Sequence, residues 1–289
     1  MLLTIKNEHL TVTVSEQGAE LQSIQSREGV EYLWQGDPKY WKSKAINLFP
    51  YVGRLVNSEY LLDGNRYQMN THGFARHCRF TPVEADDLHM VLELTENDEL
   101  LAQFPRKFRF CVIYRLNANT LEITYQVENR DERTMRFGLG GHPGFNIPFG
   151  GGEFEDYRIR FAGKCHPKLV IFSETVHVAG EADYPLLEDQ YIPLQHDLFD
   201  QDAIVLKDMI PTVTLESPKA KHAITVSFPG MPYVGFWHCP KSDAPYVCVE
   251  PWCSLPAAHG KPSVFEEQTD LLTLEPGKTY NNTWTISID

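Results

Sequence analysis

Alternation of apolar and polar residues with a period of two recurs from one end of the chain to the other. It is clearest in LTVTV at 10–14, LEITYQV at 121–127, HAITVSF at 222–228 and TWTISI at 283–288. Successive side chains of a β-strand point to opposite faces, so each stretch is predicted to be a strand with one buried face. Helical periodicity is scarce by comparison. The pattern therefore favours an all-β fold.

Turn signals separate the alternating stretches, as expected where antiparallel strands reverse direction. They are Asp63-Gly64-Asn65, Asn117-Ala118-Asn119, Ser217-Pro218-Lys219 and Glu275-Pro276-Gly277, and the glycines at 150–152 predict a short loop. One short helix is expected over 98–104, because Pro105 would end it. The 289 residues contain no repeat, low-complexity segment or linker. We therefore expect a single β-sandwich domain over 1–289, in which two antiparallel sheets bury one face each.

Charge and cysteine usage narrow the possible partners and compartment. The net charge is -13 and no Lys/Arg run is present, which argues against a nucleic-acid partner. The N-terminus, MLLTIKNEHL, lacks the apolar core of a signal peptide, and no stretch is apolar and long enough to span a bilayer. Six scattered cysteines without CxxC spacing indicate reduced thiols. These features predict a soluble cytoplasmic protein without membrane partners, either monomer or homodimer.

Four short motifs combine polar side chains with aromatic neighbours. Arg54 ends LFPYVGR, His72 lies in NTHGFAR, His142 lies in GGHPGFNI, and Glu250 lies in YVCVEPW. Each has an ordinary alternative, such as a surface arginine or a turn histidine. The glycines and proline around His142 predict an irregular loop that aims its side chain. Glu250 is expected at the end of a strand, either solvated or partly desolvated.

Taken together, the four side chains could build a carbohydrate pocket, in which sugar C–H faces stack on rings and hydroxyls meet polar groups. A metal site of two histidines and a carboxylate is the competing interpretation. The chain lacks compact His-x-His spacing, and His72 and His77 would point to opposite faces of an extended segment. We therefore predict no metal.

The motifs LFPYVGR, THGF, GGHPGFNIP and VCVEPW resemble those of the aldose 1-epimerases, or galactose mutarotases, and occur in that family's order. The resemblance covers essentially the whole chain. It is closest to a branch with the HPGFN form, some of whose members are encoded beside lactose-utilisation genes. The resemblance implies a large antiparallel β-supersandwich with an open sugar cleft. It also implies a cofactor-independent isomerase that interconverts the α and β anomers of a hexose.

The resemblance assigns Glu250 as the base that takes the proton of the anomeric O1 hydroxyl, and His142 as the acid that protonates the ring oxygen O5. A carboxylate with a pKa of about 4.3 is ionised at neutral pH, whereas an imidazole near about 6.5 can hold a proton. We therefore expect an ionised Glu250 beside a protonated His142. Because binding alone does not need both an acid and a base, the pair favours catalysis over a non-catalytic sugar-binding or sensing protein.

The resemblance also implies substrate-binding residues. His72 would orient the sugar near O5, Arg54 would hold a ring hydroxyl, and Trp252 or Trp237 would supply a stacking surface. The family's binding aspartate is matched by Asp202 in LFDQDAIVL.

Asp200 is an alternative to Asp202, because residues two apart share one face of a strand. The chain departs from better-characterised galactose mutarotases at Gly144, where they usually carry tyrosine, and at Pro251-Trp252 after the glutamate. These departures touch the sugar pocket. Arg54 and Arg76 leave a sugar phosphate open, whereas the net charge favours a neutral hexose.

Overall fold

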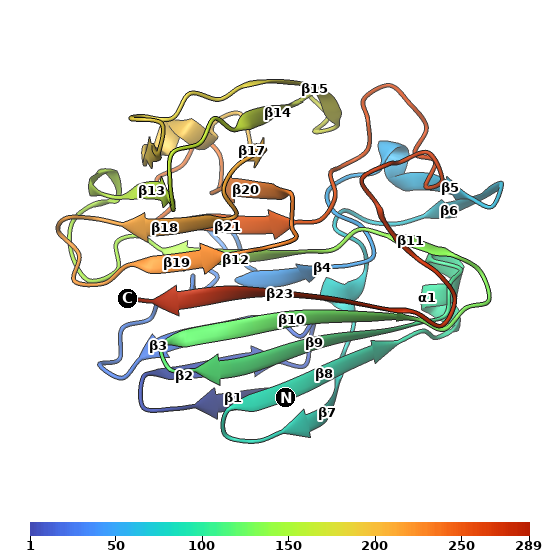
Figure 1. The fold of residues 1–289 in the computed structure, drawn as a ribbon, viewed down its shortest axis with the longest axis horizontal. Helices are drawn as coiled ribbons and strands as arrows, with labels where there is room; N and C mark the ends of the chain where they lie inside the picture. Colours follow the sequence, from blue (N-terminus) through green and yellow to red (C-terminus); the bar gives the residue numbers. More distant parts are fainter.

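The computed structural model describes residues 1–289, and antiparallel β-strands make up most of it (Figure 1). The strands are β1 (Leu2–Lys6), β2 (Leu10–Ser15), β3 (Leu21–Ser26), β4 (Ala45–Leu48), β5 (Glu59–Leu62), β6 (Asn65–Gln68), β7 (Thr81–Ala85), β8 (His89–Thr95), β9 (Phe108–Asn117), β10 (Thr120–Asn129), β11 (Met135–Phe137), β12 (Gly140–Asn146), β13 (Arg158–Phe161), β14 (Lys168–Phe172), β15 (Val178–Asp183), β16 (Tyr191–Pro193), β17 (Ile204–Lys207), β18 (Thr212–Glu216), β19 (Ile224–Ser227), β20 (Tyr233–Trp237), β21 (Tyr246–Trp252), β22 (Leu272–Leu274) and β23 (Thr279–Ile288). The helical segments are α1 (Asp98–Gln103) and the 3-10 turns η1 (Val56–Ser58), η2 (Ala75–His77), η3 (Phe154–Asp156) and η4 (His196–Phe199).

Two large sheets form the framework. One has nine strands in the order β16-β13-β18-β19-β23-β10-β9-β8-β7, and the other has seven in the order β15-β14-β17-β20-β21-β12-β4. In Figure 1 the nine-stranded sheet begins with β7 at the bottom of the view, and strands β14, β15, β17 and β20 of the seven-stranded sheet lie near the top. The predicted all-β antiparallel supersandwich is therefore confirmed.

The stretches with clear alternation fold as expected. They became β2, β10, β19 and β23, and β10 alternates between half-buried and buried residues along its whole length. The short helix is also confirmed as α1, which ends at Gln103, before Pro105. Asn97 caps it, since its Oδ1 accepts a hydrogen bond from the backbone N–H of Leu100. No helix of this chain has the length and apolar character needed to cross a membrane.

The main hydrophobic core holds 65 buried residues, drawn from Ile5 to Ile288. It extends between the two large sheets, where Gly141 of β12 meets Trp284 of β23 and Tyr125 of β10. A Cβ atom on Gly141 would lie 2.7 Å from the Trp284 ring, so glycine permits this close approach. The division into domains stays a prediction, and this continuous core favours one unit over 1–289.

Two local predictions were wrong. GGHPGFN is not an irregular loop but strand β12, and Glu250 lies within β21 rather than at its end. Nearly every residue of both strands is buried, because core side chains cover one face and a layer of aromatic side chains covers the other. A strand buried on both faces loses polar alternation, so its sequence no longer shows the period of two.

Candidate active site

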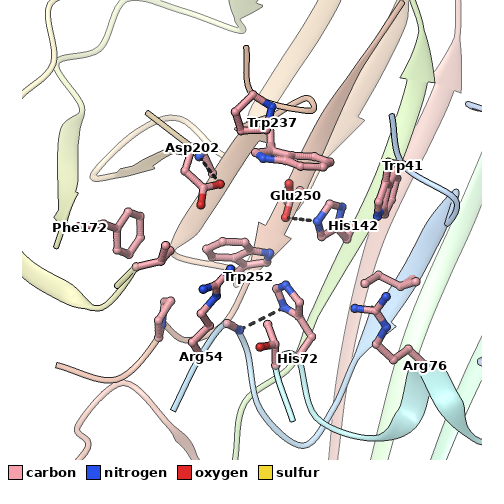
Figure 2. Close-up of a pocket in the computed structure, with 17 residues that line it drawn as sticks. Trp41, Arg54, His72, Arg76, His142, Phe172, Asp202, Trp237, Glu250 and Trp252 are labelled. Carbon is pink, nitrogen blue, oxygen red and sulfur yellow. Dashed lines mark hydrogen bonds and ion pairs between the residues drawn. The ribbon is translucent and has the colours of Figure 1, made fainter. Parts of the chain in front are cut away.

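His142 and Glu250 meet across two adjacent strands, β12 and β21, inside the seven-stranded sheet. The pairs Gly140–Trp252 and Gly144–Cys248 fix the antiparallel register of β12 and β21, and this register sets His142 opposite Glu250. His142 Nε2 lies 3.2 Å from Glu250 Oε2 (Figure 2). Two titratable groups therefore share one face of the sheet within hydrogen-bonding distance.

Burial sets the proton balance of this pair. The side chain of His142 is 10% exposed and that of Glu250 is 2% exposed. Burial lowers the pKa of His142 well below its usual value, with the charges of His72 and Arg76 adding to the effect. Burial also raises the pKa of Glu250 well above its usual value, with the Asp202 carboxylate adding to it. Both directions favour an uncharged pair, so the expected ionised Glu250 beside a protonated His142 is reversed.

Aromatic rings hold the His142 imidazole in place. Trp41 stacks on it with ring centroids 4.8 Å apart, and Trp237 meets it edge-on at 5.8 Å. Gly144, two residues along β12, leaves room for this arrangement, since a Cβ there would lie 3.3 Å from the Trp41 ring. The Trp41 indole therefore occupies the space beside the second histidine motif that a larger residue 144 would need.

His72 approaches the pair from the segment between β6 and η2. Its backbone has a φ of 67°, and the neighbouring Gly73 has a φ of 72°, so the turn depends on left-handed conformations. His72 Nδ1 accepts a hydrogen bond of 3.1 Å from the backbone N–H of Gly53. Burial, with the charges of Arg76 and Arg54, lowers the pKa of His72 to about 3. The neutral ring therefore carries its proton on Nε2, where it can donate to an oxygen.

These side chains line one pocket of about 540 Å³. Figure 2 shows Asp202 and Phe172 at one end, Trp41 and Arg76 at the other, and the His142–Glu250 pair between them. All six residues predicted to form the site line this pocket, together with Trp237; the six are Arg54, His72, His142, Asp202, Glu250 and Trp252. Its volume lies within the range typical of small-molecule sites.

The two candidate aspartates occupy a turn between η4 and β17, not a strand. Asp202 has a φ of 88° and lines the pocket, with its Oδ1 accepting from the backbone N–H of Ala203 at 2.9 Å. Asp200 is outside the pocket lining, and its Oδ1 accepts from the backbone N–H of Lys241 at 3.0 Å. The expectation that both share one strand face was therefore wrong, and of the two only Asp202 lines the pocket.

Sequence reasoning missed two aromatic residues of the pocket, Trp41 and Phe172. Trp41 precedes β4 and Phe172 ends β14. Both residues lie outside the four sequence motifs and far from His142 in sequence. Their position follows from the order of strands in the sheet, which no local pattern specifies. The only available signal for Trp41 was its place in an aromatic pair, Tyr40-Trp41, just before a buried strand.

One buried set of side chains has the composition of a metal site. Ligand atoms of His142, Cys248 and Glu250 all lie within 4.8 Å of one another. A metal would require the Cys248 thiolate, but burial raises the pKa of this thiol well above its usual value. The Glu250 carboxyl already contacts His142 Nε2. The donor set therefore suits proton exchange better than metal binding, and the absence of a metal stays a prediction.

Comparison with known proteins extends these observations. The sequence profile of the aldose 1-epimerase family matches residues 1–287. The plasmid-encoded and chromosomal LacX proteins of Lactococcus lactis subsp. lactis are each 33% identical over 300 residues, which cover 100% of this chain and 99% of theirs.

Two solved structures share the fold closely. A galactose mutarotase related enzyme from Lactobacillus acidophilus superposes with a TM-score of 0.94 at 33% identity, covering 100% of this chain and 97% of that one. A galactose mutarotase-like protein from Lactobacillus casei ATCC 334 gives a TM-score of 0.93 at 30% identity, with 100% of both chains covered.

Proposed function

The chain belongs to the aldose 1-epimerase family, and we propose that it interconverts the α and β anomers of an aldose with His142 and Glu250 as its acid–base pair. The observation that carries this assignment is the 3.2 Å contact between His142 Nε2 and Glu250 Oε2 inside a pocket of about 540 Å³, which is large enough for a monosaccharide. Mutarotation needs one proton removed from O1 and one delivered to O5. Two adjacent titratable groups meet this requirement without a redox or metal cofactor.

The pair holds one proton, and burial favours it on Glu250. Transfer of this proton to His142 would generate the carboxylate and the imidazolium. Glu250 then takes the O1 proton while His142 protonates O5, the C1–O5 bond breaks, and the aldehyde forms. Rotation about C1–C2 and reclosure through the reverse transfers gives the other anomer. The protonation states are restored after each cycle, and positioned proton transfer of this kind contributes about 10²- to 10⁴-fold in rate.

The remaining pocket residues would bind and orient the ring. His72 donates from Nε2 to an oxygen near the reacting centre, because the Gly53 N–H already occupies Nδ1. Arg54 and Asp202 reach ring hydroxyls from two sides of the pocket, and Trp252 supplies a flat surface for the sugar C–H face. The roles of all six predicted residues remain proposals.

A purely sugar-binding protein on this fold is less well supported. Burying a carboxyl group and an imidazole costs stability because both groups lose hydration, and a role in proton exchange gives a reason for this cost. His142 Nδ1 in addition has no hydrogen-bond partner although it is buried. A binding site for neutral hydroxyls has no need of either feature.

Proton NMR exchange between the α and β anomers of glucose and galactose tests the proposal. The purified protein at catalytic concentration should accelerate the exchange of at least one reducing sugar above the rate in buffer. No acceleration of any reducing sugar, neutral or charged, with binding still detectable, would instead support the sugar-binding alternative. Activity unchanged after dialysis against a chelator is expected, because no step uses a metal.

Location and assembly also remain proposals. The six cysteines are all free thiols, which supports a reducing compartment such as the cytoplasm. Monomer and homodimer both stay open, and light scattering on the purified protein would distinguish them. No nucleic-acid partner is expected from the charge of -13.

A further inference from the structure

The pocket has an uneven charge distribution. Arg54 and Arg76 lie on either side of His72, with Arg76 at the Trp41 end, whereas Asp202 lies at the opposite end from Arg76 (Figure 2). Asp202 contributes to the raised pKa of Glu250, and Arg76 contributes to the lowered pKa of both histidines. The end of the pocket that holds Arg76, away from Asp202, is therefore electropositive within a chain whose net charge is -13.

Neither pocket arginine has a carboxylate partner within ion-pair distance. Elsewhere in the chain such pairs are common, as between Arg106 and Asp63 at 2.8 Å, or Arg158 and Glu216 at 2.7 Å. Arg76 is half-buried, and burial lowers the pKa of its guanidinium. A partly buried cation without a partner is costly, so a ligand that supplies the missing negative charge would be bound favourably.

The surroundings of Arg76 strengthen the positive end. Its nearest acidic influence, Glu20, is already engaged, since Glu20 Oε1 accepts from the backbone N–H groups of Lys44 at 2.8 Å and Ala45 at 3.1 Å. Burial, with the charges of Arg76 and Lys42, also lowers the pKa of the neighbouring His77. Long-range repulsion by the acidic surface is screened beyond about 10 Å, whereas contacts at Arg76 are not.

We propose that Arg76, supported by Arg54, binds an anionic group of the sugar, so that the preferred substrates are reducing aldoses carrying a phosphate or a carboxylate. This inference rests on the proposed mutarotase function. The anionic group cannot be on O1, because O1 must be a free hydroxyl for the ring to open. It therefore belongs on another carbon, such as C6. Guanidinium groups suit both oxyanions, because their planar N–H groups match carboxylate and phosphate oxygens.

Anion binding would also help the chemistry. The titratable groups that face His142 are His72, Arg76 and Glu250, and the charge of Arg76 disfavours a proton on the imidazole. An oxyanion on Arg76 offsets this guanidinium charge. The bound substrate would then make it easier for His142 to hold the proton that O5 requires.

The test compares anomer exchange of glucose, glucose 6-phosphate and glucuronate, and of the corresponding galacto sugars, by proton NMR. We expect kcat/KM for an anionic sugar to exceed that for its neutral parent by about 10- to 100-fold, as charged hydrogen bonds allow. Comparison of the 6-phosphates with the uronates shows whether a phosphate or a carboxylate is preferred. Arg76→Gln should remove most of the ratio between anionic and neutral sugars, and Arg76→Lys should keep part of it.

Arg115→Gln is the matched control. Arg115 is exposed on β9 and outside the pocket, so this variant has the same net charge as Arg76→Gln and should keep the wild-type ratio. Equal or better turnover of neutral sugars by the wild type would overturn the inference while leaving the mutarotase function intact. A ratio unchanged in Arg76→Gln would do the same. If no sugar of the panel exchanges faster than in buffer, the proposed function itself fails.

Inorganic phosphate provides a second measurement that does not depend on the folding of a variant. It should inhibit exchange by the wild type competitively, because it occupies the anion position. Sodium chloride at equal ionic strength is the control for screening. Inhibition no greater than that by chloride would count against an anion site at Arg76.

Discussion

Strands β10 and β12 present two ways of building a sheet. β10, in the nine-stranded sheet, alternates between half-buried and buried positions over ten residues. β12, in the seven-stranded sheet, is buried at six consecutive positions, and β21 beside it is buried at all seven. The first pattern belongs to a sheet with one face in solvent. The second belongs to a sheet with the core on one face and the candidate site on the other.

The difference shows where chemistry can be placed in this fold. On β10 a polar residue on the outer face is hydrated and needs no explanation. On β12 and β21, His142 and Glu250 are polar side chains within runs of six and seven consecutive buried residues. Burial of such side chains costs stability through lost hydration, so their presence there indicates a function. Four changes test how far the two sheets differ in this respect.

The largest effect is expected at the acid–base pair. Glu250→Gln and His142→Asn should each lower kcat by about 10²- to 10⁴-fold, because each removes one proton-transfer group, while KM changes little. Anomer exchange by NMR measures both constants. Thr124→Val, on the outer face of β10, is the matched control and should leave kcat unchanged. Wild-type rates in Glu250→Gln would remove this residue from the mechanism.

Gly141→Ala tests the close contact of β12 with the nine-stranded sheet. The added Cβ would lie 2.7 Å from the Trp284 ring and 3.0 Å from the Tyr125 hydroxyl. We expect overpacking to lower the free energy of unfolding by about 1–3 kcal/mol in urea denaturation.

Gly180→Ala is the control for Gly141→Ala, because Gly180 on the edge strand β15 has no atom within 4 Å of the new Cβ. It should change stability by less than about 0.5 kcal/mol. An equally small change in the free energy of unfolding for Gly141→Ala would mean that β12 tolerates an added methyl group as well as the edge strand does.

Trp41→Leu tests whether the aromatic cover positions His142. Loss of the stacked indole should lower kcat by about tenfold, because the imidazole gains freedom. Water would also reach the ring and raise the pKa of His142 toward its usual value, so the acid limb of the pH profile should move to higher pH. Trp41→Phe keeps a stacked ring and should recover most of both effects. A pH profile that does not move in Trp41→Leu would limit Trp41 to sugar contact.

The smallest effect concerns stability and pH. Because burial raises the pKa of Glu250 above its value in the unfolded chain, the folded protein loses stability as pH rises through the raised pKa. Glu250→Gln cannot ionise, so its stability relative to the wild type should increase between pH 5 and pH 8. Urea denaturation at both values measures this. Glu84→Gln, at an exposed position on the edge strand β7, should show no such trend.

The same contrast explains what the sequence could predict. Alternation identified β2, β10, β19 and β23. The turn residues predicted where the chain reverses between strands, and Pro105 predicted the end of α1. Alternation could not identify β12, because a strand buried on both faces lacks a polar residue at every second position, and its glycines and proline are typical of loops. Local sequence therefore suggested a loop for GGHPGFN.

The candidate site was partly predictable for a different reason. His72, His142 and Glu250 lie within motifs, and the structure brings all three to one pocket. Their protonation could not be predicted, because it depends on burial by residues distant in sequence. Trp41 could not be placed either, since its contact with His142 follows from the pairing of β4 with β12.

The register of β12 and β21 also has a consequence for how the chain folds. These neighbouring strands are contributed by segments far apart in sequence, ending at Asn146 and starting at Tyr246. Their pairing closes a long loop, which is slow because of the entropy lost on closure. The acid and the base come together only when this pairing is made. Catalytic competence should therefore return late during refolding, after the local hairpins have formed.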